Sequence, residues 1–254
     1  QRGIGNGISL IIFAGIVSGI PSAIGGTVNL VNTGEMNFLV VIVILLVILV
    51  TVGIVIYVEM GERRVPVSYS RKVVMENQNK RIMNYIPIKV NLSGVIPPIF
   101  ASAILMFPST ILQASTNPYI QAIHDFLNPN SYFFNFLTFL LVVFFAYFYA
   151  SIAFNAKDIS ENLKRQGGFI PGIRPGEGTA SYLNEVASRL TFSGAIYLGL
   201  ISTLPWVLVK IMGVPFYFGG TSVLIVVSVA LDTMRRIEAQ IYMNKYQTLS
   251  AVGL

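Results

Sequence analysis

Six stretches of the chain carry no charged residue, and most are long enough to cross a lipid bilayer as a helix. An α-helix rises about 1.5 Å per residue, so about 20 apolar residues span the hydrocarbon core. The clearest stretch runs from Phe38 to Val58 and consists mostly of Val, Ile and Leu. A buried helix of a soluble protein is the alternative for one such stretch, but it does not account for six. The stretches are 7–24, 37–58, 92–115, 132–154, 191–209 and 216–231.

The composition also favours a membrane protein. Only 11% of the residues are charged and the mean hydropathy is +0.70, whereas soluble domains carry about 25% charged residues. The net charge of +6 does not indicate nucleic-acid binding, because the cations lie beside the ends of apolar stretches, where anionic lipid or a partner meets them. The chain has no Cys and a single histidine, His124. We therefore expect no disulfide, metal site, cofactor or enzymatic activity.

The positive charges alternate between the two sides of the apolar stretches, and only Lys210 breaks this pattern. Cytoplasmic loops of membrane proteins collect Lys and Arg. The sequence therefore predicts an all-α integral membrane protein with six transmembrane helices, both ends of the segment and two large loops being cytoplasmic. The cation-rich parts are Arg2, 59–91, 155–190 and 232–254, and the cation-poor outer connectors are 25–36, 116–131 and 210–215.

The stretch 92–115 differs from the others because it contains prolines and polar side chains. Proline removes a backbone donor and bends a helix, and polar groups in hydrocarbon require protein or water beside them. Two interpretations remain open: a kinked packing helix, or a helix that lines a path and moves. The residues concerned are Asn91, Ser93, Gly94, Pro97, Pro98, Ser102 and Pro108.

The first cation-rich loop has the pattern of a β-hairpin. Apolar residues alternate on either side of the polar turn 76–80, and alternation of this kind predicts two half-buried strands. The alternative is a solvated hairpin whose charges only fix the topology. The alternating residues are Val65, Val67 and Tyr69 before the turn and Ile82, Ile86, Ile88 and Val90 after it.

The second loop, 155–190, has the pattern of a helical hairpin. Asn155 is expected to cap a short helix that ends at Gly167–Gly168, and a second helix is expected to start near Thr179. Prolines on both sides stiffen the tip at Arg174. A rigid cationic tip is a candidate docking point, and a structural turn is the alternative.

Four segments, in this order and spacing, resemble the bacterial SecY family, the central subunit of the Sec protein-conducting translocon. The resemblance covers essentially the whole chain, from the family's fifth membrane helix to its C-terminal tail, and its first four helices and plug have no counterpart here. Pro98 departs from the family, since it makes a double proline where relatives can carry a single one. The segments are RGIGNGIS (2–9), GVIP (94–97), FIPGIRPG (169–176) and PFYFGGTS (215–222).

The resemblance implies roles for residues that the pattern alone assigns to packing. Four aliphatic residues match the ring that closes the family's pore, where an apolar constriction excludes water and ions yet deforms around a passing chain. Others match the lateral gate and the cytoplasmic surface that receives partners, with Arg174 at a functionally critical position. The ring residues are Ile8, Ile12, Ile99 and Ile225, the gate residues are Asn91, Ser102 and Phe107, and the docking residues are Arg63, Arg64, Lys80, Arg81, Arg174, Pro175, Gly176 and Glu177.

The resemblance further implies a pore-forming subunit in the bacterial inner membrane that passes unfolded or nascent polypeptides and releases apolar segments sideways into lipid. Its partners are SecE-type and SecG-type small subunits, the SecA ATPase, the ribosome, signal sequences with nascent chains, the lipid bilayer and the N-terminal half of the same channel. The implied domains are 1–36, a helix-five-like span with its outer connector, and 37–254, a bundle of five spans with its loops and tail.

The opening Gln1-Arg2-Gly3 stands immediately before a span, with no initiator Met, so an internal fragment is expected. Two other functions remain open on the residues alone. One is a secondary transporter of small solutes with broken helices, and the other is a structural membrane subunit without a pore. The absence of a central ionisable residue in the six stretches argues against ion-coupled transport.

Overall fold

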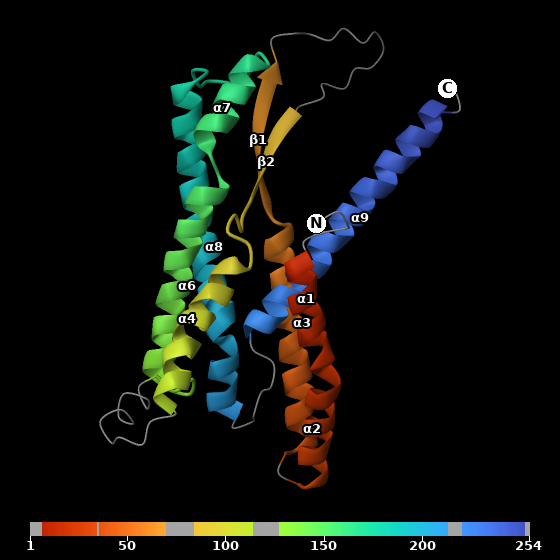
Figure 1. Ribbon diagram of the computed structural model, residues 1–254, viewed down its shortest axis with the longest axis vertical. Helices are drawn as coiled ribbons and strands as arrows, with labels where there is room; N and C mark the ends of the chain where they lie inside the picture. Colours follow the sequence, from red (N-terminus) through yellow and green to blue (C-terminus); the bar gives the residue numbers. More distant parts are fainter. Residues whose placement is uncertain (1–6, 35, 70–83, 114–126, 213–219, 252–254) are drawn as a thin grey trace. The chain divides into compact units, whose positions relative to one another are not determined.

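The charge-poor sequence folds mainly into helices (Figure 1). The computed structural model describes residues 7–34, 36–69, 84–113, 127–212 and 220–251. The contacts divide the chain into two units. The first unit comprises residues 1–56 and 201–254, and the second comprises residues 57–200.

Two consecutive helices, α1 (Gly7–Ser18) and α2 (Ile20–Asn32), begin the first unit. The expectation that 25–36 forms a connector is wrong for most of that segment, because the helix continues to Asn32. Pro21 does not stop it, since Pro21 lies in the first turn of α2, where a backbone N–H has no intrahelical partner. The helical path is interrupted only at Gly19.

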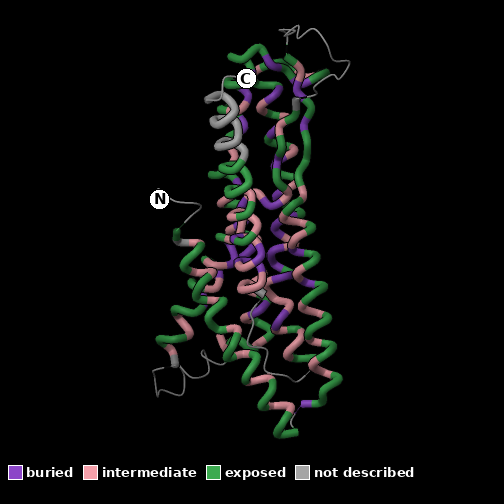
Figure 2. The backbone as a smooth tube through the Cα atoms, turned by 90° about the vertical axis from the view of Figure 1, so that its right-hand side faces the viewer, coloured by how far each residue is buried: buried purple, intermediate pink, exposed green. Residues whose placement is uncertain are grey.

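Helix α3 (Phe38–Met60) is apolar on all sides. Its buried residues are Thr51 and Val55, while Leu39, Leu49 and many others are exposed. Figure 2 colours the described backbone by burial. The Thr51 hydroxyl donates to the Val47 carbonyl at 2.8 Å, so it does not need a partner outside the helix. An apolar surface of this kind suits lipid or apolar neighbours.

Helix α9 (Gly220–Ala251) packs against α1 in the first unit. The expected span 216–231 and the expected tail are thus parts of one helix over the described residues, because α9 continues 20 residues beyond Leu231 (251 minus 231). No Pro or Gly interrupts the sequence from Thr221 to Ala251. Residues 216–219 lie outside the described part of the chain.

Helices α4 (Ile96–Gln113) and α6 (Tyr132–Ala153) belong to the second unit, together with α8 (Glu177–Met212) as far as Leu200. Helices α4 and α6 pack side by side, with the Phe100 ring 5.5 Å from the Tyr149 ring. Gly199 of α8 permits a close approach to α6, since a Cβ there would lie 2.5 Å from the Phe139 ring.

Helix α8 runs without a break across the expected boundary at 190/191 between loop and span. It includes Pro205, and it also includes Lys210, which was expected in an outer connector. The helix continues because the amphipathic residues before 190 and the apolar residues after it are both compatible with a helix. Only the surroundings that the side chains favour change there, from water on one face to lipid or apolar neighbours.

A small sheet connects the two cation-rich loops, with strand order β2-β1-β3. Strands β1 (Glu62–Tyr69) and β2 (Asn84–Lys89) pair antiparallel, as the alternation predicts, with Val65 opposite Ile86. The expected turn 76–80 and Ile82 lie outside the described residues. A third strand, β3 (Gly168–Phe169), was not predicted; it pairs with Ser68 and Tyr69 of β1.

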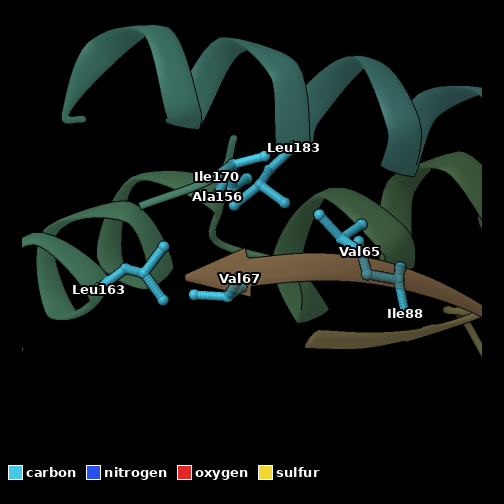
Figure 3. Close-up of a cluster of buried hydrophobic side chains, with 7 residues drawn as sticks. All are labelled: Val65, Val67, Ile88, Ala156, Leu163, Ile170 and Leu183. Atoms are coloured by element: carbon cyan, nitrogen blue, oxygen red, sulfur yellow. The ribbon is translucent and has the colours of Figure 1, made fainter. Parts of the chain in front are cut away.

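The same two loops share one hydrophobic core (Figure 3). Side chains from the sheet meet side chains from α7 (Ala156–Arg165), from the segment that follows β3 and from the first turns of α8. The two loops, each predicted from its own local pattern, therefore fold together. We call this set the two-loop core, and its members are Val65, Val67, Ile88, Ala156, Leu163, Ile170 and Leu183.

Among the described residues, four helices are long and apolar enough to cross a membrane, and Ile96–Leu112 is a shorter apolar helix. The expected span 92–115 thus begins later, because residues 91–95 form a turn before α4. The chain is therefore a mostly helical multi-pass membrane protein. The four helices are Ser9–Asn32, Phe38–Met60, Tyr132–Arg165 and Glu177–Ile211.

Candidate functional site

The four isoleucines expected to form a ring are divided between the two units. Ile8 and Ile12 lie on α1 and Ile225 lies on α9, and these two helices pack together. Ile225 is buried and Ile12 is half-buried, while the side chain of Ile8 is outside the description. Ile99 lies on α4 in the other unit and is half-buried. The structure therefore brings α1 and α9 together but leaves the complete ring untested.

The double proline does not bend the middle of α4. Pro97 and Pro98 are buried in its first turn, where the backbone N–H groups have no intrahelical acceptor. Ile99 follows directly, and its carbonyl accepts a 2.9 Å hydrogen bond from the Ser102 hydroxyl. The proline inside the helix is Pro108. Any bend in α4 is thus expected near Pro108 rather than at the pair.

Two of the expected gate residues lie on α4 with different exposure. Ser102 is half-buried and satisfied by the backbone of its own helix, so its hydroxyl does not demand a partner elsewhere. Phe107 exposes 71% of its surface and is available to lipid or to another chain. A large exposed aromatic on an apolar helix is compatible with a surface that opens to lipid.

The third expected gate residue, Asn91, is buried in a polar cluster before α4. Its Nδ2 donates to Glu59 Oε1 at 2.7 Å and to the Gly94 carbonyl at 3.2 Å. Its Oδ1 accepts from the Ser93 hydroxyl at 3.2 Å. Gly94 has φ +66, a conformation that favours glycine and allows the turn into α4. Glu59 was not predicted to belong to this cluster, because the sequence placed it in the loop 59–91, whereas it lies in the last turn of α3.

Arg174 lies at an exposed tip that is fixed on both sides. Its carbonyl accepts from the backbone N–H of Thr179 at 3.1 Å and from the Thr179 hydroxyl at 3.0 Å. On the other side, Ile170 is 3% exposed in the two-loop core, and Ile173 packs against that core. Pro175 and Glu177 are exposed beside Arg174, and Gly176 is half-buried. The guanidinium is thus presented from a rigid support.

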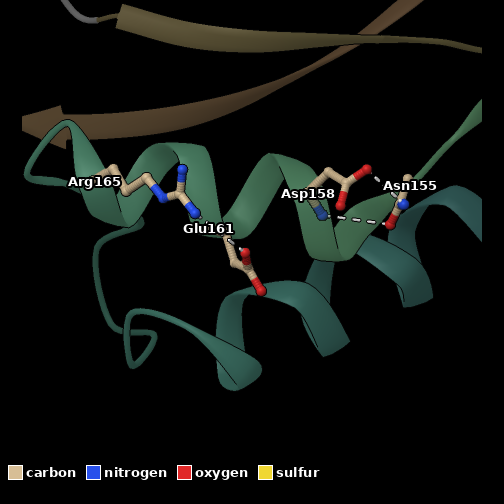
Figure 4. Close-up of polar contacts among 4 residues, drawn as sticks. All are labelled: Asn155, Asp158, Glu161 and Arg165. Carbon is tan, nitrogen blue, oxygen red and sulfur yellow. Dashed lines mark hydrogen bonds and ion pairs between the residues drawn. The ribbon is translucent and has the colours of Figure 1, made fainter.

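Helix α7, which precedes this tip in the chain, is held by polar contacts near its start (Figure 4). Asn155 caps it as predicted, accepting from the backbone N–H of Lys157 at 3.2 Å and of Asp158 at 3.4 Å. The Asn155 amide in turn donates to the Asp158 carboxylate at 2.7 Å. Gly167, with φ +70, follows the helix as expected for its end. A groove of about 680 Å³ lies between α7 and the beginning of α8.

The cations of the hairpin are only partly described. Arg63 and Arg64 are exposed on β1, while Lys80 and Arg81 lie outside the described residues. The Arg64 Nε lies 2.7 Å from Glu62 Oε1, and its guanidinium lies 4.8 Å from the centre of the Tyr85 ring. The hydrogen bond to Glu62 raises the pKa of Arg64 further above its usual value. Arg64 is therefore held charged in one orientation above β2.

Known proteins match the chain along its full length. The SecY family model matches residues 1–234. The protein translocase subunit SecY of Helicobacter pylori strain 26695 is 72% identical over 254 residues, which cover 100% of this chain and 60% of that protein. The Escherichia coli K12 protein of the same name is 40% identical over 256 residues, which cover 98% of this chain and 57% of that protein.

Solved structures agree in fold. A structure described as that of a protein conducting channel superimposes with a TM-score of 0.66 at 19% identity, over 94% of this chain and 60% of that chain. The chain thus spans about 60% of the length of the relatives that it matches. The family model, the identity to named relatives and the fold agree with the four motifs in the sequence, and the chain belongs to the SecY family.

Proposed function

We propose that this chain is part of the pore-forming subunit of a protein translocation channel, which passes unfolded or nascent polypeptides across the inner membrane and releases apolar segments sideways into lipid. The observation that carries this proposal is the 72% identity, over the whole chain, to a protein translocase subunit SecY. The names of the matching proteins describe a translocase subunit and a protein conducting channel. The remaining helices of the proposed channel correspond to the part of the relatives that this chain does not match.

The proposed topology has six membrane helices with the two-loop core in the cytoplasm. Four described helices are long enough to span the membrane, and α4 and the apolar first part of α9 supply the other two. The cations support this orientation, since the described strands β1 and β2 and helix α7 carry Arg63, Arg64, Lys89 and Lys157 among others. The implied domains, 1–36 and 37–254, remain part of the proposal.

The pore seal is proposed to consist of Ile8, Ile12, Ile99 and Ile225 together with aliphatic residues from the rest of the channel. The packing of α1 on α9 supports this proposal for three of them, because Ile8, Ile12 and Ile225 lie on these two neighbouring helices. An aliphatic ring blocks hydrated ions because it offers no replacement for their hydration shell. The lateral gate is proposed to involve α4 through Asn91, Ser102 and Phe107.

The docking surface is proposed to be the exposed side of the two-loop core, including Arg63, Arg64, Lys80, Arg81 and the tip 174–177. A motor such as the SecA ATPase or a ribosome would supply the energy there. Small subunits of the SecE and SecG type and signal sequences complete the proposed partners. The rigid presentation of Arg174 supports this role, because a preorganised residue loses little conformational entropy on binding.

The decisive experiment replaces Ile99 and Ile225 with Asn, singly, in the full-length channel. A polar group in the ring should hydrate the constriction, so ion leak in proteoliposomes and tolerance of defective signal sequences should both rise. Matched Ile42→Asn on the exposed side of α3 controls for a general effect of Asn in the membrane. An unchanged leak and unchanged signal-sequence tolerance in both ring variants would contradict the pore.

A further inference from the structure

The groove of about 680 Å³ between α7 and the beginning of α8 has no role in the proposed function. Leu163 of α7 and Leu183 of α8 belong to the two-loop core, whereas Glu161 and Asn184, on other faces of the same helices, line the groove. In Figure 4 the Glu161 side chain points away from the strands. The groove therefore lies on a side of these two helices that the sheet does not cover.

One end of this groove lies where a membrane helix ends. Ile152 and Phe154 line it there, beside the last residue of α6, Ala153. The 22 residues of α6 are about 33 Å long, enough for the hydrocarbon core of about 30 Å, and the headgroups add about 5–8 Å on each side. In the proposed topology the first turns of α7 therefore lie at the level of the lipid headgroups. We call this part of the groove its membrane end.

The groove is lined by charges of both signs that cancel. Lys157 and Lys164 are its two cations, and Glu161 and Glu177 are its two anions. All four are exposed, and neither lysine nor Glu177 forms an ion pair with another described residue. Glu161 has a single contact of this kind, at 4.0 Å from Arg165. Such a lining complements a ligand that carries a positive and a negative group of its own.

The charged pair at the membrane end is Lys157 and Glu161. Residues four apart on a helix are neighbours, about 5–6 Å between their Cβ atoms, so the ammonium and the carboxylate reach adjacent points of the groove. The Asn155 side chain already accepts from the backbone N–H groups of Lys157 and Asp158. An anion here is therefore recognised by the lysine side chain rather than by the beginning of the helix. The amide of Asn184 lines the groove from α8.

We propose that the membrane end of this groove binds the headgroup of phosphatidylethanolamine. The lipid phosphate lies beside the Lys157 ammonium, and the primary ammonium of the lipid donates to the Glu161 carboxylate. The acyl chains pass over Ile152 and Phe154 into the bilayer. Phosphatidylcholine lacks an N–H to donate, and phosphatidylglycerol has no cation for Glu161. This inference rests on the proposed function for one element only, the topology that places the end of α6 at the membrane surface.

The test compares three lipids on the full-length channel with its small subunits in detergent. Phosphatidylethanolamine, phosphatidylcholine and phosphatidylglycerol with the same acyl chains are titrated separately, and native mass spectrometry measures the affinity of the first lipid bound. The wild type should bind phosphatidylethanolamine about threefold more tightly than phosphatidylcholine, the effect of one exposed ionic contact. The two lipids have the same net charge and the same chains, so only the hydrogen bonding of the ammonium separates them.

Two neutral variants separate the two contacts. Lys157→Gln should weaken the binding of both phosphatidylethanolamine and phosphatidylglycerol about threefold, because both carry the phosphate. Glu161→Gln should weaken only phosphatidylethanolamine, because only this lipid places an N–H donor beside residue 161. Lys89→Gln on β2 and Glu185→Gln on α8 are the matched controls, exposed and outside the groove, and should bind as wild type. Equal wild-type affinities for phosphatidylethanolamine and phosphatidylcholine, or unchanged phosphatidylethanolamine binding in both groove variants, would overturn the site.

The ring variants Ile99→Asn and Ile225→Asn, measured for ion leak in proteoliposomes, separate this inference from the proposed function. If they leak ions while the groove variants bind every lipid as the wild type does, the channel stands and only the lipid site is wrong. If neither ring variant leaks while the groove variants show the expected lipid pattern, the lipid site stands and the pore assignment is wrong.

Discussion

The hydroxyl of Ser160 on α7 donates a 2.6 Å hydrogen bond to the carbonyl of Gly176, 16 residues further along the chain. Ser160 is only 2% exposed, so its hydroxyl depends on a partner within the protein. Gly176 stands two residues after Arg174 and directly before α8. The bond therefore connects the tip that carries Arg174 to α7.

Ser160→Ala is expected to loosen this tip without unfolding the protein. The Gly176 carbonyl keeps its 3.0 Å bond from the backbone N–H of Ala180, so the loss of the Ser160 bond should cost about 0.5–1.5 kcal/mol locally. Affinity for the motor ATPase should fall several-fold, because the tip has to be ordered on binding. Binding isotherms on proteoliposomes measure this, with Ser181→Ala, an exposed serine of the same groove, as the control. Equal affinity for both variants would show that the bond does not hold the tip.

Arg174→Glu is expected to abolish most motor-driven translocation while leaving membrane insertion of the subunit normal. The reversed charge faces the partner from a rigid position and repels the acidic group that arginine would bind. Translocation of a secretory protein and protease mapping of the inserted subunit are the two measurements. Arg165→Glu, on the exposed surface of α7, is the control. Wild-type translocation by Arg174→Glu would refute docking at the tip.

Gly168→Ala is expected to separate the two loops. A Cβ at residue 168 would lie 3.0 Å from Cε1 of Tyr69 and 3.1 Å from Cγ of Leu163, so β3 has to move away from β1 or α7. Overpacking of this kind costs about 1–3 kcal/mol. Limited proteolysis of the loops should become faster. Gly178→Ala, where the nearest atom would be 3.4 Å away, should leave the rate unchanged.

Gly199→Ala is expected to destabilise the packing of α8 on α6. The added methyl would lie 2.5 Å from the Phe139 ring, which has to change its rotamer or push the helices apart. The midpoint of thermal unfolding in detergent should fall. Phe139→Leu makes room, so the double variant should recover most of the loss. A double variant as unstable as Gly199→Ala would mean that the two residues do not compete for space.

Local signals in the sequence predicted much of this architecture. The cap at Asn155, the helix end at Gly167, the alternation of Val65 and Val67 and the apolar run of α3 each depend on residues close together in the chain. Those elements were found where they were expected. Helix α8 was not found with its expected bounds. No Gly or Pro stands at the expected boundary between the loop helix and the span, so nothing in the sequence ends the first helix there.

Long-range pairings could not be predicted from the same signals. Strand β3 has two residues, too few for a recognisable alternation, and its partner lies about 100 positions earlier (169 minus 68 is 101). The bond between Glu59 and Asn91 joins residues 32 positions apart, and no local pattern indicates that they pair. The roles proposed for Ile12, Ile99 and Ile225 depended on family resemblance, because an isoleucine in an apolar helix has no local feature that distinguishes a pore from packing.

The pairing of β3 with β1 has a consequence for anyone who builds chimeras between relatives. A loop transplanted from another bacterium brings one side of a jointly packed interface and meets a host loop that was selected with a different partner. Exchange of 59–91 alone, or of 155–190 alone, should therefore give poorly assembled hybrids even between channels that are each fully active. Exchange of both loops together should restore assembly, so the two segments behave as one transferable module.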